Sequence, residues 1–496
     1  MLPLIIDSEK LLDILKFDSY NPLLFNTGLF LILFMLFITV YQLLRKFKTA
    51  KLLFVILFSL YFYYKSSAEY CFIILGVCIS DFVLGIALDR CKKSFWRKSI
   101  VALNVILNVG MLVFFKYFNL LYETIANFSD KPFDPLDIIL PAGISFFTFR
   151  SISYIVDVYR GDIKACHDFL SYTFYLTFFP PLLAGPVVRA KDMLPQVEAN
   201  RMASKAMTAE GIFLIMSGLV KKVIVADFIS QNFVERVFEN PALYSGFENM
   251  MGMYGFIIQL YCDFSGYTDM AIGVALLLGY RFLDNFRAPF KSQNPTEFWR
   301  RWHISLSFWL RDYLYIPLGG NRCSKTRHHM NLMTTMVIGG LWHGASWMFL
   351  IWGGLQGAFL VGHKSIKGVL PRVKPENRRK WWRLAGNIFL TFNLIAISFV
   401  FFKARSMEVV GDMFHQILFD FHLSVAPQFI SGYLMIVLVM VAALLTHFAP
   451  KRWIRKMRKS YSATPLFVQA VILAIVILVI IQVRQTDIMP FIYLQY

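Results

Sequence analysis

The chain has 496 residues, of which 57% are hydrophobic and 16% are charged, whereas about 25% of the residues of an ordinary soluble protein are charged. Apolar runs long enough to cross a bilayer recur along the whole length, so the composition excludes a water-soluble protein and predicts one helical membrane domain. Lysine and arginine together number 50 against 31 acidic residues, which gives a formal net charge of +19.

The first 22 residues contain a short apolar stub followed by acidic residues spaced among leucines. They have no basic leader and no small-residue cleavage site, so we expect no signal peptide here. The mixture of acidic and apolar positions predicts an amphipathic helix over residues 1–22 that lies on the outer surface of the membrane.

Apolar runs predict membrane spans on both sides of a less regular middle region. They cover residues 23–44, 52–64, 70–88, 100–122, 384–402, 431–449 and 466–483. The connecting stretches differ in charge: 123–137 is acidic, and the basic ones are 45–51, 90–98, 372–383 and 451–459. Because basic loops face the cytoplasm, both termini are expected to be extracytoplasmic, with an even number of crossings.

These four basic stretches account for the net charge of the chain. A nucleic-acid-binding protein gathers its basic residues on one face among exposed aromatic side chains, whereas here each basic stretch adjoins a membrane span. We therefore expect the lipid bilayer as a partner and no nucleic acid. The chain is expected to be a multi-pass protein of the cell (inner) membrane.

Proline residues and glycine pairs interrupt the middle of the chain. Its span-like pieces are 138–156, 169–185, 211–228, 250–280 and 331–361. Such breaks are typical of re-entrant or half-crossing helices around an internal cavity. The six cysteines are scattered without metal-ligand spacing, so we expect neither disulfides nor a metal site.

The predicted fold is therefore an all-α polytopic membrane protein with about 10–12 spans, together with re-entrant or interfacial helices. Four parts are expected along the chain: the extracytoplasmic amphipathic helix 1–22, N-terminal spans in 23–137, a core with re-entrant helices in 138–370, and C-terminal spans in 371–496.

Asp263 and Asp269 stand out because ionisable groups in an apolar run are costly and need a partner or a function. They lie close to Tyr267 in the same run. We favour an internal hydrogen-bond network that braces packed helices, completed by Arg281 or Arg287 across a turn, over a catalytic role.

Residues 294–322 form the densest polar and aromatic stretch of the chain. Asn294 is a good N-cap residue and Glu297 stands at capping-box spacing, so one helix is predicted from here to a point before Pro317. On that helix one stripe contains Arg300, His303, Ser307 and Arg311, and another contains Phe298, Trp302 and Trp309.

The arginines of this helix either anchor at lipid headgroups or bind an anionic ligand. A phosphate-rich ligand such as coenzyme A suits the stripe, because arginine pairs with phosphate through two parallel hydrogen bonds. Arg300, Arg311 and Trp302 are therefore the candidate donor-binding residues.

His343 lies deep in an apolar run and is flanked by Gly339, Gly340 and Gly344. Glycines at this density allow another backbone or a substrate to approach closely. A lone buried histidine is more often a satisfied core residue than a catalyst, yet ionisable groups inside a membrane are functional candidates by default. Composition alone leaves both interpretations open.

Five segments closely resemble the membrane-bound O-acyltransferase family, and within it the bacterial branch typified by the integral-membrane component of alginate O-acetylation. They are FFPPLLAGPVVR (178–189), DFSGYTDMAIGVALLLGYRFLDNF (263–286), FWRRWHISLSFWLRDYLYIPLGGNR (298–322), GLWHGASWMFLIWGG (340–354) and the terminal FIYLQY (491–496). The resemblance implies a helical fold with a central tunnel, into which an acyl donor enters from the cytoplasm.

The resemblance places the family's near-invariant catalytic histidine on His343 and its second motif histidine on His303. It implies structural or tunnel-lining roles for Asp263, Asp269, Tyr267, Trp342 and Trp347. Members of this branch often carry a further histidine after the tryptophan run, where this chain has Gln356. This departure argues against any scheme that needs a third histidine nearby.

Acyl thioesters are already activated, so the protein need only orient the donor, remove a proton from the acceptor hydroxyl and stabilise a tetrahedral oxyanion. A buried imidazole tends to stay neutral, which suits His343 as general base or acyl relay. We expect His303 to assist from the cytoplasmic face, and Trp342 and Trp347 to exclude water. No tightly bound cofactor is expected; the donor, acetyl-CoA or another acyl thioester, binds as a substrate.

The resemblance thus implies an enzyme that moves an acyl group, with acetyl as first choice, toward hydroxyls of an exported polysaccharide. Its implied partners are a secreted or membrane-anchored SGNH-like acetyltransferase and the polysaccharide export machinery. D-alanyl transfer to teichoic acid is an alternative within the family. A transporter or a non-enzymatic scaffold of an export complex is an alternative of another class.

Overall fold

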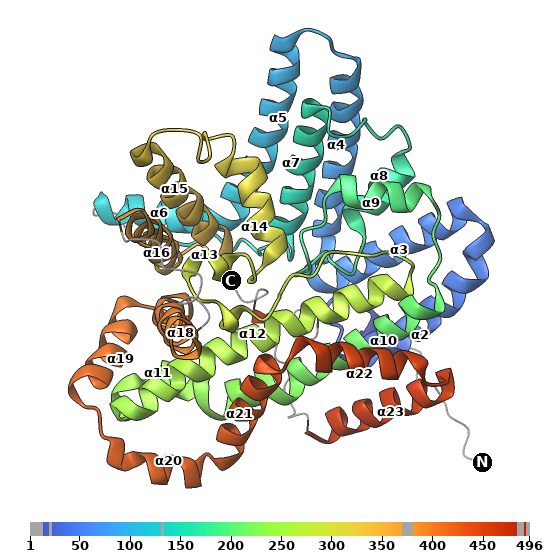
Figure 1. Ribbon diagram of the computed structural model, residues 1–496. Coiled ribbons are helices and arrows are strands. Elements are labelled where there is room, and N and C mark those ends of the chain that lie inside the picture. Colours follow the sequence, from blue (N-terminus) through green and yellow to red (C-terminus); the bar gives the residue numbers. More distant parts are fainter. Residues whose placement is uncertain (1–12, 19–21, 130–132, 370–379, 484–490, 493–496) are drawn as a thin grey trace. The chain divides into compact units, whose positions relative to one another are not determined.

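The computed structural model describes residues 13–18, 22–129, 133–369, 380–483 and 491–492, and within these ranges its regular elements are helices (Figure 1). The predicted all-α class is therefore confirmed. Of the amphipathic helix predicted for 1–22, the structure shows a helical turn at 13–15. Most of that prediction, like residues 493–496 of the terminal FIYLQY, lies outside the described residues.

The chain divides into two compact units. One is formed mainly by residues 1–203, and the other mainly by 204–277 and 281–485, joined by Phe491 and Ile492. Every candidate site residue lies in the second unit. The division into four parts along the chain, predicted from the sequence, stays a prediction.

The first unit is built of helices. They are α2 (Gly28–Leu43), α3 (Lys48–Ser67), α4 (Cys71–Arg90), α5 (Ser94–Leu112), α6 (Phe118–Phe128), α7 (Ile144–Arg160), α8 (Phe169–Thr177) and α9 (Ala190–Glu198). Helix α7 packs against α4 and α5, and these three run together in Figure 1.

A buried carboxylate braces the helices of this first unit. Asp81 of α4 is fully buried and accepts hydrogen bonds from Asn104 (2.7 Å), Ser151 (2.8 Å) and Tyr172 (2.6 Å). These donors come from α5, α7 and α8, so one side chain connects four helices. Hydrogen bonds of this kind are electrostatically stronger in a low-dielectric interior than in water.

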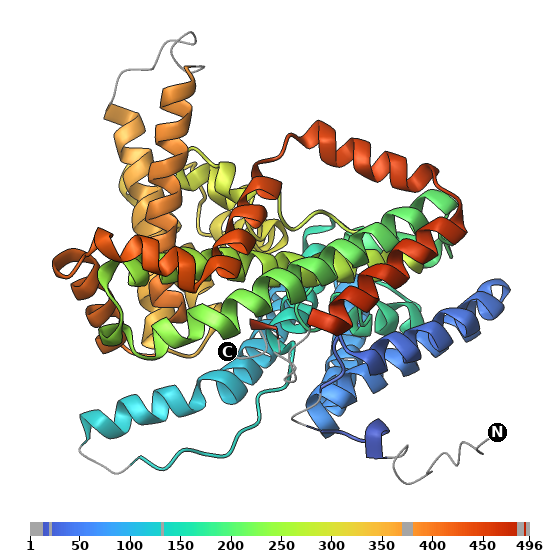
Figure 2. The same ribbon diagram turned by 90° about the horizontal axis from the view of Figure 1, so that it is seen from below.

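The second unit is built around the long helix α12. Its helices are α10 (Lys205–Leu219), α11 (Glu235–Glu239), α12 (Gly246–Leu277), α13 (Pro295–Trp299), α14 (Ile304–Leu310), α15 (Lys325–His343), α16 (Trp347–Val369), α18 (Trp381–Lys403), α19 (Met407–Phe419), α20 (Ala426–Gly432), α21 (Leu434–Phe448), α22 (Lys451–Ala463) and α23 (Leu466–Val483). Helix α10 runs alongside α12, and α16 packs between α15 and α18 (Figure 2).

Several helices are long and apolar enough to cross a membrane. Among the described residues they are the four segments Gly28–Lys46, Lys48–Arg90, Ser94–Phe128 and Trp381–Lys403. Two bent pairs raise the number to six by length and composition: Leu423–Gly432 with Leu434–Phe448, and Lys451–Ala463 with Leu466–Gln482. The chain is thus a polytopic helical membrane protein, while the count of about 10–12 spans stays a prediction.

Breaks predicted for the middle region are present. The run 331–361 is divided between α15 and α16 near Gly344, and the helix in 169–185 ends at Thr177, shortly before Pro180. Proline lacks a backbone N–H and clashes with the preceding turn of a helix, which explains the second break.

The basic stretch 451–459 corrects one prediction, because it is not a loop but the start of α22. Between Lys451 and Ala463 the sequence contains neither glycine nor proline, and lysine, arginine and methionine are good helix formers. A run of charge therefore marks the edge of a span here without marking an irregular connection.

Candidate active site

His303 lies at a break in the segment for which we predicted one helix. Helix α13 starts after Asn294, whose Oδ1 accepts the N–H of Glu297 at 2.9 Å, as the capping signal predicted. It ends at Trp299, and α14 starts only at Ile304. Between them His303 has a φ of +40°. This conformation is uncommon for a residue with a side chain and costs about 1–3 kcal/mol.

Asn285 holds the turn that contains His303. Its backbone oxygen accepts the N–H of Ile304 at 2.9 Å, and its Oδ1 accepts the N–H and the hydroxyl of Ser305 at 3.1 and 2.9 Å. Asn285 is 1% exposed, so these bonds form away from water, where they are electrostatically stronger. They replace the bonds of a continuous helix, so the predicted single helix is wrong, and with it the stripe of Arg300, His303, Ser307 and Arg311.

Aromatic side chains surround the ring of His303, which is completely buried. Its centre lies 4.6 Å from that of Phe264, with the two rings nearly perpendicular, and 5.8 Å from that of Trp342. His303 lies outside the candidate membrane spans, and burial lowers its pKa from 6.5 to about 3. The imidazole is therefore neutral at pH 7 and can accept or donate a hydrogen bond.

His343 ends α15 and is 5% exposed. Its ring centre lies 5.0 Å from that of Trp342, 5.1 Å from that of Trp352 and 5.2 Å from that of Phe402. The rings of His343 and His303 are 6.4 Å apart, centre to centre. This is longer than a direct hydrogen bond between two imidazoles allows.

Two glycines allow α15 and α16 to approach at the end that carries His343. A Cβ on Gly340 would lie 2.4 Å from the backbone oxygen of Phe349, and one on Gly344 would lie 2.1 Å from the ring of Phe349. Side chains cannot occupy such distances, so only glycine permits this approach. The close packing that the glycines predicted is confirmed.

Trp342 and Trp352, rather than Trp342 and Trp347, cover the imidazoles. Trp347 begins α16 and is 56% exposed, whereas Trp342 is 5% and Trp352 1% exposed. The chain reverses direction between α15 and α16, and this turn leaves Trp347 outside the packed face of α16. The expectation that Trp347 shields His343 is therefore corrected to Trp352, one helical turn further along.

The three expected donor-binding residues fall in different surroundings. Arg300 and Arg311 are exposed, and Arg311 forms an ion pair with Asp312 at 2.7 Å. Trp302 is 2% exposed and stacks on Phe298 with ring centres 5.4 Å apart. The two arginines are thus accessible to an anion, whereas Trp302 lies in the core of the unit.

Two adjacent lysines hold the two carboxylates of α12, of which Asp263 is buried and Asp269 is partly buried. Lys222 Nζ lies 2.6 Å from Asp263 and Lys221 Nζ lies 2.6 Å from Asp269. Lys222 is 1% exposed and also contacts Asp227 at 2.8 Å. The predicted internal network is therefore confirmed, and it joins α12 to the π-helical turn Val220–Asp227 that follows α10.

The predicted partners of these carboxylates are wrong. Arg281 pairs with Glu210 at 3.2 Å, and Arg287 pairs with Asp284 at 3.4 Å. The pair of adjacent lysines was the signal that would have indicated the partners of the aspartates. Two cations inside the apolar run 211–228 require nearby anions, just as the two aspartates require nearby cations. Asn285, Trp352 and Phe402 carried no comparable signal.

The C-terminal segment is seated on this network. Ile492 donates its backbone N–H to Asp263 at 3.0 Å. The ring of Phe491 lies 4.6 Å from Lys222 Nζ and 4.3 Å from the ring of Tyr267. Tyr267 is 1% exposed, so its surroundings are formed in part by the end of the chain.

Gln356, for which the resemblance implied a departure from the family pattern, has a structural role. It accepts a hydrogen bond from Trp299 Nε1 at 3.2 Å and donates one to Ser398 at 2.7 Å. It is fully buried, and it connects α13, α16 and α18. A neutral amide can make both bonds at any pH.

Comparisons with known proteins agree with the resemblance. The family model described as membrane-bound O-acyltransferase matches residues 163–404, a range that contains both histidines. A probable alginate O-acetylase of Pseudomonas aeruginosa is 39% identical over 400 residues, which cover 79% of this chain and 74% of the relative. One of Pseudomonas putida is 34% identical over 500 residues, covering 96% and 100%. A peptidoglycan O-acetyltransferase of Helicobacter pylori is 33% identical over 419 residues, covering 78% of each chain.

Proposed function

Because this chain belongs to the membrane-bound O-acyltransferase family and is an O-acyltransferase, we propose that it moves an acetyl group from a cytoplasmic thioester, acetyl-CoA, toward hydroxyl groups of an exported polysaccharide. The relatives are named for the O-acetylation of alginate and of peptidoglycan, which are both polysaccharide polymers. Family membership argues against the transporter and scaffold alternatives.

The pair of buried imidazoles carries the proposal. The ring of His343 at the end of α15 and the ring of His303 in the turn before α14 have their centres 6.4 Å apart. In our scheme His343 takes the proton from the attacking hydroxyl, or relays the acyl group, and His303 hydrogen-bonds the reacting carbonyl. General base catalysis by a positioned imidazole contributes about 10²–10⁴-fold to a rate.

Water exclusion is the second requirement, since a thioester hydrolyses if water reaches it beside a base. The rings of Trp342, Trp352 and Phe402 pack around His343 at centre distances of 5.0 to 5.2 Å. A closed apolar wall of this kind also strengthens each polar contact inside it. The arrangement supports transfer in preference to hydrolysis.

The donor's phosphates are proposed to contact Arg300 first. Arg300 is exposed and close in sequence to His303, whereas Arg311 must exchange its contact with Asp312 for a phosphate. Transfer to the polymer is proposed to be completed outside by an SGNH-like acetyltransferase working with the export machinery. In this scheme the chain lies in the cell (inner) membrane with both termini outside.

The test uses the full-length protein in lipid nanodiscs with radiolabelled acetyl-CoA, and it measures thiol release and acetyl transfer. We expect His343→Ala to lower turnover at least about 100-fold. His415→Ala is the control, because His415 is exposed on α19; it should keep wild-type turnover. Wild-type turnover in folded His343→Ala protein refutes the role of His343.

The same assay distinguishes the donors. If wild-type protein shows no turnover with acetyl-CoA but transfers D-alanine from a carrier-protein thioester, the proposed acetyl donor is wrong and the D-alanyl alternative replaces it. Arg300→Gln should raise the KM for acetyl-CoA while leaving kcat near the wild-type value, because it removes a contact to a part of the donor that does not react.

A further inference from the structure

Helix α22 is strongly amphipathic, with a basic face and an apolar face on opposite sides. Residues spaced three and four apart share one side of a helix, and on the first side these are Arg452, Arg455, Lys456 and Lys459. The opposite side carries Trp453, Met457 and Tyr461 at intervals of four. The four basic residues of the first side are exposed, so their charge is available to a ligand.

The apolar face of α22 is only partly covered. Tyr461 packs against Phe213 of α10 with ring centres 5.7 Å apart and is 8% exposed. Trp453 and Met457 on the same face are 58% and 62% exposed. Large exposed apolar side chains beside a row of cations are typical of a helix that lies in a membrane interface.

The connection to α23 fixes the direction of α22. The two helices are bent by 119° at a short break. Gln469, which is 4% exposed, donates to the backbone oxygens of Tyr461 at 3.3 Å and Thr464 at 3.0 Å across this break. If α23 crosses the bilayer, as its uniformly apolar sequence predicts, α22 lies closer to the membrane plane than to its normal.

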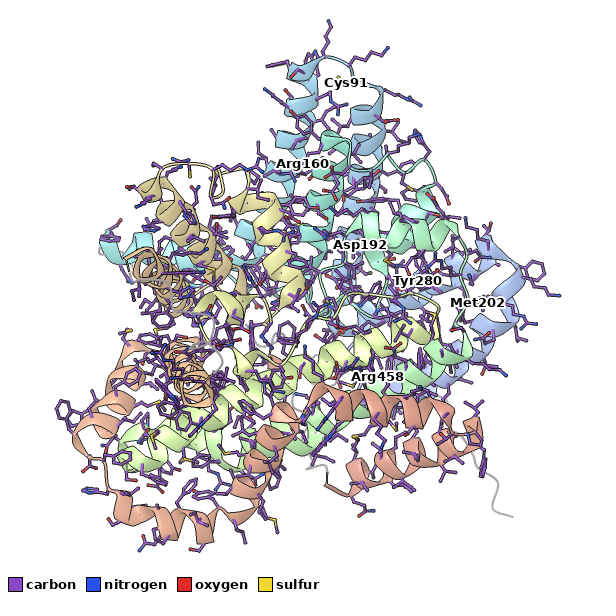
Figure 3. All side chains as sticks on the ribbon, viewed as in Figure 1. Cys91, Arg160, Asp192, Met202, Tyr280 and Arg458 are labelled. Carbon is purple, nitrogen blue, oxygen red and sulfur yellow. The ribbon has the colours of Figure 1, made fainter. Side chains whose placement is uncertain are left out.

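An ion pair attaches α22 to the body of the second unit. Arg458 Nη1 lies 2.9 Å from Glu210 of α10, and Arg458 is labelled on α22 in Figure 3. Glu210 also contacts Arg281 at 3.2 Å. Arg458 is thus engaged by protein, while the remaining basic residues of the helix are exposed.

We propose that α22 is a binding site for anionic phospholipid headgroups. Trp453 and Met457 enter the boundary between headgroups and acyl chains, and Arg455, Lys456 and Lys459 contact the phosphates above them. Three features support one occupant: the opposed faces, the orientation set by the bend, and the continuity with the span α23. Phosphatidylglycerol has the required chemistry, a phosphodiester with net negative charge joined to acyl chains.

The proposal goes beyond a topology signal. Basic residues that only orient a span act during insertion and need no fixed geometry, whereas α22 holds its cations on one face of an ordered helix. The basic stretch 90–98 provides the contrast, because its residues lie at the ends of α4 and α5 around a three-residue connection. Lys92, Lys93 and Lys98 there are equally exposed.

The experiment titrates the full-length protein in nonionic detergent with soluble dihexanoylphosphatidylglycerol and measures the dissociation constant by calorimetry. The test variant is R455Q/K456Q/K459Q, and the matched control is K92Q/K93Q/K98Q, which removes the same charge elsewhere. At low ionic strength we expect the test variant to weaken binding on the order of 100-fold and the control to change it by less than about threefold. Binding should weaken as salt is added.

Further ligands separate the sources of the same chemistry. Dihexanoylphosphatidylcholine, which has no net charge, should bind at least about tenfold more weakly. Glycerophosphoglycerol, the headgroup without chains, should also bind weakly, and W453A/M457A should weaken phosphatidylglycerol binding without changing the charge. Equal binding of the neutral lipid, or equal binding of the chainless headgroup, overturns the proposal. The proposal is also overturned if acetyl-CoA competes with phosphatidylglycerol for the wild-type protein and this competition is lost in R455Q/K456Q/K459Q, since the helix would then be part of the donor site.

Discussion

Asn285→Ala is the sharpest test of how the site is built, because Asn285 contacts neither ligand nor His343 yet holds the turn before α14. The substitution removes the acceptor of two donors of Ser305, the backbone N–H at 3.1 Å and the hydroxyl at 2.9 Å. Ser305 is 8% exposed, so water cannot readily replace the lost acceptor.

The magnitude follows from these two bonds. A buried donor left without an acceptor costs about 1–3 kcal/mol, but the hydroxyl can rotate to another acceptor, so we expect a loss of about 2–3 kcal/mol in the free energy of unfolding. The turn also holds His303 at a φ of +40°, a conformation that itself costs about 1–3 kcal/mol. With the clamp removed, relaxation of this strain moves the imidazole away from His343.

A displaced imidazole should lower turnover more than the stability loss alone would. A misplacement of about 1 Å costs on the order of 100-fold in rate, so we expect kcat of Asn285→Ala to fall by about that factor, measured with acetyl-CoA on folded protein. The KM for acetyl-CoA should change little, since Asn285 has no proposed contact with the donor's phosphates.

Asn249→Ala is the matched control. Asn249 is also fully buried in the second unit, and its Nδ2 donates to the backbone oxygens of Pro241 and Tyr244 at 2.9 Å. It should lose a similar amount of stability while keeping kcat near the wild-type value. If both variants lower kcat equally, or if Asn285→Ala turns over like wild type, the assignment of Asn285 as a positioning residue is wrong.

Three further predictions concern charge, protonation and packing. Lys222→Met should lower the free energy of unfolding by about 3–5 kcal/mol in thermal or denaturant unfolding, because it leaves the buried Asp263 and the partly buried Asp227 without their cation. Asp263→Asn, which leaves Lys222 one anion, should cost less; the opposite order contradicts the network. Burial lowers the pKa of His303 to about 3, so between pH 6.5 and pH 3 the unfolded chain binds a proton that the folded chain does not. Stability that is present above pH 6.5 should therefore be lost as the pH falls toward 3. His303→Gln should flatten this dependence of Tm on pH, and an unchanged slope refutes the contribution of His303. Gly344→Ala should abolish turnover, since its Cβ meets the ring of Phe349; retained activity argues against fixed packing at His343.

Hydropathy predicted most of the helices, because the apolar runs are long and each matches a single element. The runs 23–44, 384–402 and 466–483 correspond to α2, α18 and α23 within a few residues. The span-like run 250–280 likewise corresponds to α12. In these cases the local sequence contains the whole reason for the structure, since an apolar segment of about 20 residues in lipid must satisfy its backbone internally as a helix.

The site could be predicted only in part, for reasons that differ between residues. The glycines around His343 predicted a close approach, but the residue that approaches them, Phe349, depends on where the chain reverses. The helix start at Asn294 could be predicted from its side chain, which caps the helix. The break at His303 was not, because the hydrogen bonds that replace helical ones come from Asn285, on a different segment of the chain.

The net positive charge of the chain does not come from the surroundings of the buried histidines. In the second unit the two lysines beside α12 each have acidic partners: Lys221 pairs with Asp269, and the buried Lys222 pairs with Asp263 and Asp227. These two lysines face three aspartates, so the network leaves no uncompensated cation in the interior. An anionic donor must accordingly be attracted by exposed cations such as Arg300 and not by the site itself. It follows that substitutions at the surface should act on KM and on salt dependence, whereas substitutions among the buried ion pairs should act on stability and kcat.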